Sequence, residues 1–402
     1  GGLRLAATVL AVGAVGVPIV LEIALMVDRP LECVVARRYL QRAAEKLDRV
    51  DPIVVGITGS YGKTSTKSYV THLLSGTYRV VASPRSFNNR AGLARAVNET
   101  LVAGTEVFVA EMGAYGPGEI AALVSWLAPR VAAITAIGPV HLERFRSLDR
   151  TLAAKSEILS GAQAAVLNVD DERLAQLADD LAAAGQRVIR CSAMDRRGDV
   201  AVIPSTGGAE FYLAGLPVGG FTLDNRRPLA LTNVACAAGI ALALAVPVTE
   251  IATRLSSLPS VDHRLQAATS PTGVVVLDDT FNANPAGVRL ALAALEANSP
   301  LGTRKVVVTP GMVELGARQW IENETFGREA ASVATDLVVV GTTNRRALLA
   351  GVAQTGQPPE PDHRGLRVVT ADSRAAAVAW VRRELRAGDV VLYENDLPDQ
   401  YP

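Results

Sequence analysis

The sequence has few of the residues that build covalent or metal-linked frameworks. Among its 402 residues there are three cysteines, Cys33, Cys191 and Cys236. Because they are odd in number and widely spaced, they predict neither a disulfide framework nor a cysteine metal site, which suits a reducing cytoplasm. We expect Cys191 and Cys236 to be small buried apolar residues.

The sequence also lacks an excess of charge of either sign. Forty Lys and Arg residues balance forty Asp and Glu residues. A protein that binds nucleic acid needs a concentrated basic face, so we expect no nucleic-acid partner. Aromatic residues make up only 4% of the chain, but 49% of it is hydrophobic. This length and composition can bury more than one core, which predicts two or three domains.

A glycine-rich segment overlaps and follows the short apolar run at residues 53–57. Residues 54–67 read VVGITGSYGKTSTK, which predicts a strand, a turn and the start of a helix. Such a turn directs backbone N–H groups at an anion, its lysine supplies charge for the β and γ phosphates, and its threonine can ligate Mg²⁺. We therefore predict that the segment binds ATP and Mg²⁺. Its predicted binding residues are Gly59, Ser60, Gly62, Lys63, Thr64 and Ser65, with Lys63 also catalytic.

The front of the chain is apolar. Residues 5–27 carry one charge, Glu22, and about 20 apolar residues are enough to span a bilayer as a helix. A signal peptide fits poorly because no small-residue cleavage site follows, while a buried helix of a soluble protein stays open. Five basic residues follow the run: Arg37, Arg38, Arg42, Lys46 and Arg49. Because basic residues tend to stay on the cytoplasmic side, they favour a cytoplasmic location for the predicted ATP-binding part. We expect a transmembrane helix within residues 1–29, one or more passes through the cell membrane, and an amphipathic connector helix at 30–50.

The rest of the chain alternates short apolar runs with helical stretches. This pattern predicts an α/β fold with a doubly wound, mostly parallel sheet. Residues from about 199 to 231 are rich in glycine and proline, and they predict a small antiparallel insertion. A second alternating set begins after residues 259–264. We therefore expect one α/β domain at 51–262 and a second at 263–402.

Six further segments occur in a fixed order with the glycine-rich loop. They are residues 86–89 (SFNN), 110–113 (AEMG), 141–145 (HLERF), 154–158 (AKSEI), 278–285 (DDTFNANP) and 311–316 (GMVELG). Together these motifs resemble the Mur ligases, above all the MurF branch, over roughly residues 50–400. The resemblance implies a central phosphate-loop ATPase domain and a C-terminal Rossmann-like α/β domain. It also implies a ligase that forms an amide bond in peptidoglycan precursor synthesis, by way of an acyl phosphate.

The resemblance also implies metal and catalytic residues. Glu111 follows a buried strand, at the strand end where α/β sheets bind ligands, and by resemblance it ligates Mg²⁺. His141 resembles a metal-coordinating histidine, although imidazole suits Mg²⁺ less well than oxygen does. Lys155, expected at a helix start, resembles a lysine that is carbamylated and so becomes an anionic metal ligand. The implied catalytic residues are Lys63, His141 and Lys155, and the implied metal ligands are Thr64, Glu111, His141 and Lys155.

Further residues are implied to bind the substrates. Asn233 and Arg264 resemble contacts to adenine or phosphate, and Asp279 and Asn282 resemble nucleotide contacts from the second domain. If both domains contribute, the domains must close for turnover. The acceptor peptide is implied to contact Ser86, Asn88 and Asn89, which are also ordinary turn-forming residues.

The front of the chain departs from the MurF pattern. MurF carries a folded domain for the uridine nucleotide there, whereas this sequence shows only the apolar segment and the connector. We therefore expect a carboxylate acceptor that is a muropeptide or a lipid-linked envelope precursor, and an amino acid or dipeptide such as D-alanyl-D-alanine as the amine. Two alternatives stay open: a related ligase outside the wall, acting in polyglutamate formation or cofactor amidation, and a non-catalytic ATP-binding module of a membrane complex.

Overall fold

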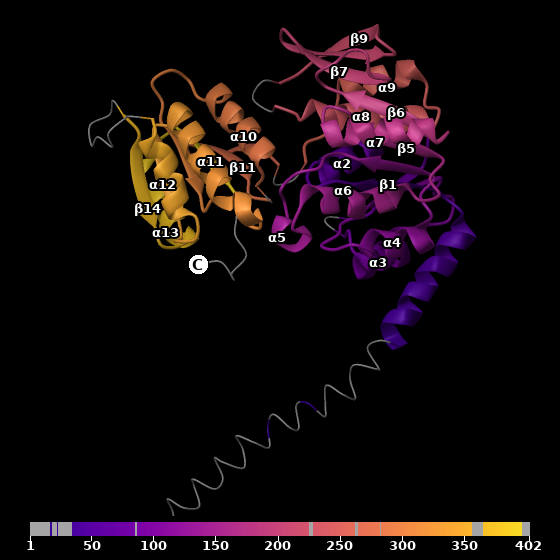
Figure 1. Ribbon diagram of the computed structural model, residues 1–402. Helices are drawn as coiled ribbons and strands as arrows, with labels where there is room; N and C mark the ends of the chain where they lie inside the picture. Colours follow the sequence, from indigo (N-terminus) through magenta and orange to yellow (C-terminus); the bar gives the residue numbers. More distant parts are fainter. Residues whose placement is uncertain are drawn as a thin grey trace, which may run out of the picture.

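The protein consists of two α/β bodies, each built on one sheet, as the computed structural model shows (Figure 1). The structure describes residues 17, 22, 34–84, 87–224, 228–261, 264–281, 283–355 and 365–395. Both bodies are predicted by the alternation of apolar runs and helical stretches, because strands covered by helices on both faces must be apolar throughout. The predicted α/β class is confirmed.

The first sheet is mostly parallel. Its strand order is β2-β3-β1-β4-β5-β6-β7-β8-β9. The strands are β1 (Ile53–Thr58), β2 (Val80–Ala82), β3 (Val107–Glu111), β4 (Val131–Ile134), β5 (Ala164–Asn168), β6 (Arg187–Ser192), β7 (Val200–Ser205), β8 (Gly208–Leu213) and β9 (Leu216–Thr222). All residues of β3, β4 and β5 are buried. The carboxyl ends of β1, β3 and β4 meet at one edge, which is the edge where ligands bind in such sheets.

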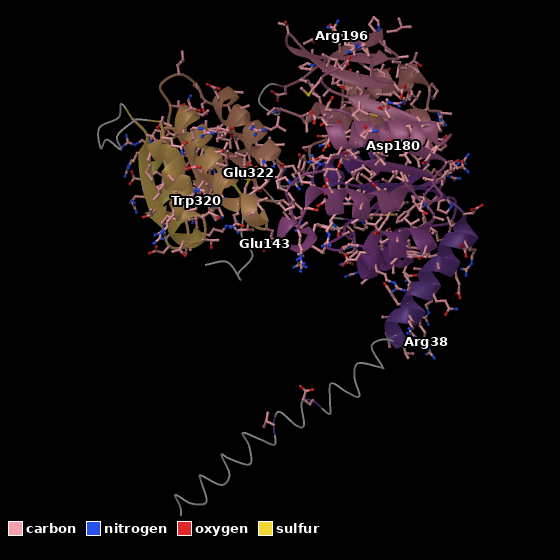
Figure 2. All side chains as sticks on the ribbon, in the orientation of Figure 1. Arg38, Glu143, Asp180, Arg196, Trp320 and Glu322 are labelled. Atoms are coloured by element: carbon pink, nitrogen blue, oxygen red, sulfur yellow. The ribbon has the colours of Figure 1, made fainter. Side chains whose placement is uncertain are left out.

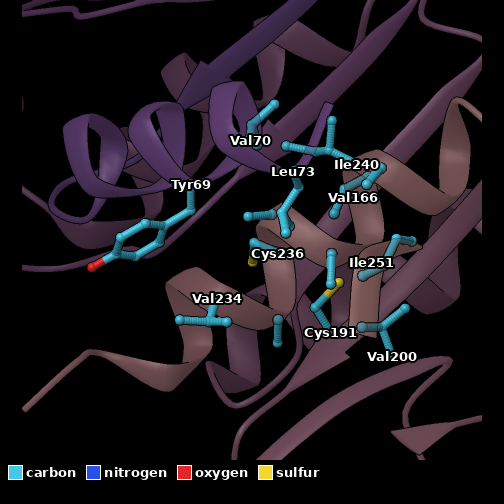
Figure 3. Packing of buried hydrophobic residues seen from close by; sticks show 14 of the residues in the cluster. Tyr69, Val70, Leu73, Val166, Cys191, Val200, Val234, Cys236, Ile240 and Ile251 are labelled. Atoms are coloured by element: carbon cyan, nitrogen blue, oxygen red, sulfur yellow. The ribbon is translucent and has the colours of Figure 1, made fainter. Parts of the chain in front are cut away.

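Helices cover both faces of this sheet. One face carries α2 (Lys63–Leu74), α8 (Leu231–Ala243) and α9 (Val248–Leu255), whose apolar residues form one core with the strands. The other carries α3 (Arg90–Thr100), α4 (Glu119–Leu127), α6 (Leu148–Ser156) and α7 (Glu172–Ala183), which form a second core. Figure 3 shows Cys191 and Cys236 among the apolar side chains of the first core, and both are buried thiols, as expected.

The predicted antiparallel insertion is part of the first sheet. Strands β7, β8 and β9 pair antiparallel to one another, and β7 also pairs with β6 in parallel. Glycines with positive φ, Gly207 at 78° and Gly215 at 81°, lie in the two turns between these strands. The turns were therefore predictable from glycine, whereas the pairing that extends the main sheet was not.

The second body has its own six-stranded sheet, in the order β10-β11-β15-β12-β13-β14. Only the β10–β11 pair is antiparallel. The strands are β10 (Gln266–Thr269), β11 (Val275–Asp279), β12 (Lys305–Thr309), β13 (Asp336–Val340), β14 (Arg367–Ala371) and β15 (Val390–Glu394). The helices α10 (Pro285–Ala297), α11 (Gln319–Val333) and α12 (Arg345–Ala353) contribute to one core, and α13 (Arg374–Glu384) contributes to the other. The sequence had not predicted α12 or β10.

A helix at residues 34–50 extends from the first body (Figure 1). Its last turns pack on α3, where Lys46 Nζ donates a hydrogen bond to Asn98 O at 2.8 Å and Asn98 Nδ2 donates to Tyr39 O at 3.0 Å. Ala43 and Leu47 join the core on that face of the sheet. The structure thus has a helix over residues 34–50 of the predicted connector, and the apolar residues of its later turns join the core that includes α3, whereas Val34 and Val35 are exposed.

The prediction that a transmembrane helix anchors the enzyme in the cell membrane is wrong. None of the helices in the described ranges is both long enough and apolar enough to cross a bilayer. The helix at 34–50 carries arginine and lysine residues between its apolar ones, and Leu40, Ala43 and Leu47 pack into the core that includes α3. Residues 5–27, on which the prediction rested, lie outside the described residues except for Val17 and Glu22.

The two bodies touch near the carboxyl end of β4. The short helix α5 (Leu142–Phe145) reaches the second body, where Leu142 N–H donates to Glu314 O at 2.9 Å. A Cβ placed on Gly316, in the short helix η2 (Gly316–Arg318), would lie 3.3 Å from the backbone nitrogen of Glu143. In Figure 2, Glu143 on α5 lies at the side of the first body that faces the second. Residues from both bodies can therefore line one site.

Candidate functional site

The glycine-rich loop joins β1 to α2 as predicted. Gly59 has a φ of 154° and Gly62 a φ of 84°. A Cβ on Gly59 would lie 2.0 Å from Thr135 Oγ1, and one on Gly62 would lie 2.3 Å from Asn233 Oδ1. The Lys63 ammonium donates to Gly59 O at 2.8 Å, and burial lowers the pKa of Lys63. The loop thus has the tight backbone and the inward-facing cation that an anion-binding turn requires.

Replacing Gly62 by alanine should destabilise the protein more than the same change at Gly118. Both glycines precede a helix with a φ of 84°, so alanine meets the same backbone strain of about 1–2 kcal/mol at each. Only Gly62 is also crowded, by Asn233, whereas nothing lies within 4 Å of a Cβ on Gly118. Urea unfolding of both variants measures the difference, and equal losses would show that contact with Asn233 does not restrict this position.

A carboxylate lies at the centre of the site. Glu111, the last residue of β3, is 2% exposed and accepts a hydrogen bond from Thr64 Oγ1 at 3.0 Å. Lys67 Nζ, one turn along α2 from Lys63, forms an ion pair with the same oxygen, Glu111 Oε2, at 3.0 Å. Asn88 Nδ2 donates to the other oxygen at 3.2 Å. The two lysines hold the pKa of Glu111 below its usual value despite burial, so the carboxylate is an anion at neutral pH.

The predicted acceptor residues lie beside this carboxylate where they are described. Asn88 packs against Gly113, whose added Cβ would lie 2.8 Å from Asn88 Cγ. Asn89 lines the same cavity, and its Oδ1 also accepts the Gly92 N–H at 2.8 Å and so caps α3. The structure therefore supports the interpretation of Asn89 as an ordinary turn-forming and helix-capping residue. Ser86 lies outside the described residues.

Lys155 is a buried lysine in the last turn of α6, not at a helix start as we expected. Its side chain is 3% exposed, and its Nζ lies 5.9 Å from the centre of the Phe145 ring. Burial, with a smaller effect of the Lys63 charge, lowers the pKa of Lys155 to about 7. Glu157 does not pair with it, because the Glu157 oxygens accept the N–H groups of Gly118 and Ala121. Lys155 is therefore no ordinary surface cation, and much of it is a neutral amine at pH 7.

His141 connects the two bodies. It has a φ of 60° at the start of α5, and its Nδ1 contacts Glu314 Oε2 of the second body. The Tyr115 ring lies edge-on to the imidazole, with 4.6 Å between ring centres. Burial lowers the pKa of His141, although Glu314 opposes that shift. The histidine predicted as a metal ligand is thus also part of the contact between the bodies.

These residues line one cavity of about 260 Å³. Its lining includes Lys63, Thr64, Glu111, His141 and Lys155 from the first body, together with Arg264, Phe281 and Asn284 from the second. An adjoining cavity of about 520 Å³ lies on the other side of Gly62 and is lined by Ser65, Asn233, Arg264 and Asp279 among others. The phosphate loop therefore separates a small polar cavity from a larger one.

The predicted residues of the second body lie at its sheet edge. Arg264 lines both cavities, is half-buried, and lies 5.0 Å from the centre of the Phe281 ring. Asp279, the last residue of β11, is 6% exposed, and burial raises its pKa to about 6. Asn284 caps α10 by accepting the Gly287 N–H at 3.0 Å, and Pro285 occupies the first helical position, where proline is favoured. Asn282 lies outside the described residues.

Comparison with known proteins agrees with this arrangement. The Mur ligase middle domain matches residues 57–220, and the Mur ligase glutamate ligase domain matches residues 263–393. The UDP-N-acetylmuramoyl-tripeptide–D-alanyl-D-alanine ligases of Mycobacterium bovis and Mycobacterium tuberculosis are each 35% identical over 368 residues, which cover 84% of this chain and 69% of the mycobacterial proteins. The chain belongs to the Mur ligase family.

Solved structures give the same relationship. MurF from Acinetobacter baumannii matches with a TM-score of 0.73 and 26% identity, over 90% of this chain and 77% of that protein. MurF from Thermotoga maritima in complex with ADP matches with a TM-score of 0.72 and 25% identity, over 90% of this chain and 80% of that one. This Mur ligase is an ATP-dependent ligase of the MurF type, and the predicted use of ATP and Mg²⁺ is confirmed.

The donor set of this Mur ligase suits Mg²⁺ in part. Thr64 and Glu111 offer oxygen atoms, which Mg²⁺ prefers. The described residues contain no group of three or more His, Cys, Asp or Glu side chains that could hold a metal ion, so protein carboxylates alone do not complete a site. Mg²⁺ is usually bound by one or two carboxylates together with substrate phosphate oxygens and water, so Thr64 and Glu111 suit it as part of such a set.

Sequence reasoning missed several residues of this Mur ligase site. Lys67 could have been found by its spacing, since residues four apart share a face of a helix. Glu314 lies in one of the family motifs, but the sequence gave it no partner. No local sequence pattern indicated a functional role for Tyr115 or Glu394. Their positions depend on contacts between elements that are distant along the chain.

Proposed function

We propose that this Mur ligase joins D-alanyl-D-alanine to the peptide of a UDP-N-acetylmuramoyl tripeptide. The relatives from Mycobacterium and from Bacillus subtilis are named for that activity. The observation that carries the proposal is the small cavity, because it gathers a phosphate loop, a carboxylate, a histidine and a buried lysine in one place. The expected lipid-linked acceptor rested on the membrane helix and on the departure of the front of the chain from the MurF pattern. It has no support, because the relatives are named for a UDP-linked acceptor.

The reaction requires a site that tolerates accumulated negative charge. An acceptor carboxylate oxygen attacks the γ phosphorus of ATP, ADP leaves, and an acyl phosphate forms. The amine nitrogen then attacks the acyl carbon, loses a proton, and inorganic phosphate leaves as the amide forms. We assign to Lys63 and to the N–H groups at the start of α2 the neutralisation of the phosphoryl oxygens.

We assign the metal position to Thr64 and Glu111, with His141 and Lys155 on the same cavity wall. Mg²⁺ bound there would supply positive charge to the phosphoryl oxygens. A further anionic ligand would form if the neutral amine of Lys155 adds carbon dioxide and loses a proton, which leaves a carbamate. Burial of the side chain and its pKa of about 7 support this proposal, because only the neutral amine can add carbon dioxide.

We assign the larger cavity to the nucleoside. Asn233, Arg264 and Asp279 line it, and Asn282 stays a prediction. Asn88 and Asn89 remain candidates for the acceptor peptide, as does Ser86. The division into domains at 51–262 and 263–402 is retained as a proposal. Because Arg264 faces both cavities, we expect turnover to depend on the relative position of the two bodies.

Mass spectrometry of reaction products tests the proposed substrates. The full chain is incubated with ATP, Mg²⁺ and D-alanyl-D-alanine, and with either a UDP-linked tripeptide, a UDP-linked dipeptide or a folate-type glutamate acceptor. We expect a product only from the UDP-linked tripeptide, heavier by the dipeptide less one water. A product from the folate-type acceptor would favour the ligase outside the wall, and ATP binding with no product from any acceptor would favour the non-catalytic module.

A further inference from the structure

Two carboxyl side chains lie next to each other at the carboxyl edge of the second sheet. The parallel strands β11 and β15 pair in a register that places Asp279 opposite Glu394. Glu394 is 0% exposed and Asp279 is 6% exposed. Neighbouring residues in register on parallel strands extend their side chains to the same face of a sheet, so the two carboxyl groups share one dry location.

The hydrogen bonds around the pair are incomplete without a proton. Asp279 Oδ1 accepts the Leu265 N–H at 3.2 Å. Within the described ranges, neither buried oxygen of Glu394 receives a hydrogen bond from an N–H or hydroxyl group. The remaining partner is the Asp279 carboxyl, which hydrogen-bonds to Glu394 only if one of the two carries a proton. Ionisation of two adjacent buried carboxyl groups carries a high free-energy cost, because the two negative charges repel and neither is solvated. A shared proton is therefore the low-energy arrangement.

The proton shared by Asp279 and Glu394 affects how strongly the Arg264 guanidinium can interact with a bound nucleotide. The charged groups that act on the pair are Arg264 and Asp278. With one proton shared, Asp279, Glu394 and Arg264 together carry no net charge. Without it, two negative charges would compete for the Arg264 guanidinium, which lines both cavities. Protonation therefore keeps Arg264 available to an anion in the site.

We propose that Glu394 is a positioning residue for nucleotide binding, which holds a proton against Asp279 and thereby keeps Asp279 and Arg264 turned to the nucleotide. This inference rests on the proposed function of the larger cavity. Glu394 does not line either cavity and acts through Asp279.

The end of β15 is built to hold such a position. The residue after Glu394, Asn395, donates its N–H to Asp279 O at 3.1 Å and its Nδ2 to Gly311 O at 2.6 Å. Its Oδ1 accepts the Ala283 N–H at 3.4 Å. The loops that follow β11 and β12 are thus fixed to the end of β15, and a change at Glu394 is expected to reach the site without loss of the sheet.

The first arm of the test measures stability and needs no catalysis. Burial and Asp279 raise the pKa of Glu394 well above its usual value, so the folded state retains a proton that the unfolded state releases. Stability of the native protein must then fall as pH rises above the usual glutamate pKa, and Glu394→Gln removes that loss. We expect the melting temperature of Glu394→Gln, relative to the native protein, to rise steadily between about pH 5 and about pH 8. A difference that does not change with pH would overturn the shared proton.

The second arm measures nucleotide binding by calorimetry with ADP as the probe. Glu394→Gln retains an N–H donor for Asp279 and should bind within about two-fold of the native protein, whereas Glu394→Met has similar length and no donor. We expect Glu394→Met to bind ADP about ten-fold more weakly, which is the usual size of a lost hydrogen bond to a charged group. The matched control is Glu296→Met, which changes an exposed residue of α10 that lines neither cavity and should leave ADP binding unchanged.

The outcomes separate the two proposals. If the native protein binds ADP but forms no amide, the proposed function fails while both arms still report on Glu394. If Glu394→Met binds ADP as the native protein does, or if Glu296→Met weakens binding equally, the positioning role is wrong. In turnover, the same role predicts a raised KM for ATP in Glu394→Met with kcat nearly unchanged.

Discussion

Replacing Lys63 with alanine is expected to abolish ATP-dependent ligation while the fold stays intact. Lys63 lies at the start of α2 with its ammonium turned back over the loop, where it can neutralise phosphoryl oxygens in a site shielded from water. Loss of one such group costs about 2.7–4 kcal/mol of transition-state stabilisation, or a factor of about 10²–10³ in kcat. The measurement is amide formation under saturating ATP.

Two controls accompany this variant. Lys305→Ala removes a lysine at the amino end of β12, away from the carboxyl edges of both sheets, and should keep full activity. The melting temperature of Lys63→Ala should not fall, because burial lowers the pKa of Lys63 and the charged form is already disfavoured in the fold. Activity of Lys63→Ala within a few-fold of the native protein would remove the phosphate-loop interpretation.

Replacing Lys155 with alanine should reduce ligation to a similar degree, by about 10² or more. If the lysine acts as a carbamate, only a negative ligand is missing from the variant, and short carboxylic acids should restore part of the activity. The native protein assayed at limiting bicarbonate should gain activity as pH rises through about 7, because the pKa of Lys155 is about 7 and the neutral amine is the form that adds carbon dioxide.

The native protein in the same carboxylic acids is the control for this rescue, and it should gain nothing. Lys155→Met, which keeps the length of the side chain, should be as inactive as Lys155→Ala and less open to rescue, because its side chain fills the buried space. An active Lys155→Ala, together with an intact mass of the native protein that lacks added carbon dioxide, would contradict the assignment.

The features that the sequence predicted well depend on neighbouring residues. The phosphate loop is local, since Gly59 and Gly62 need positive φ within a few residues of Lys63. Glu111 could be placed because it ends an apolar strand, and the carboxyl ends of parallel strands meet at one edge. The alternation predicted in the second domain is seen at strand β12, where an apolar run lies between polar residues and forms a buried strand.

The features that the sequence missed depend on register and on packing between elements. The pair of Asp279 and Glu394 exists because β15 inserts between β11 and β12, an order that the chain does not reveal. The contact of His141 with Glu314 requires the two bodies to meet. The membrane prediction used the length and apolar character of residues 5–27 and the basic residues that follow. No helix of the described residues is long and apolar enough to cross a bilayer, and residues 5–27 lie outside the described residues except for Val17 and Glu22.

Transfer of oxygen from the acceptor to phosphate tests the central claim, that this Mur ligase activates a carboxylate with ATP, most directly. The acceptor peptide is prepared with ¹⁸O in the carboxylate that becomes the amide, and inorganic phosphate is analysed by mass spectrometry after turnover with ATP and D-alanyl-D-alanine. Because a carboxylate oxygen becomes the bridge of the acyl phosphate, we predict one labelled oxygen in each phosphate released and none in ADP. Amide formation with unlabelled phosphate would contradict the account.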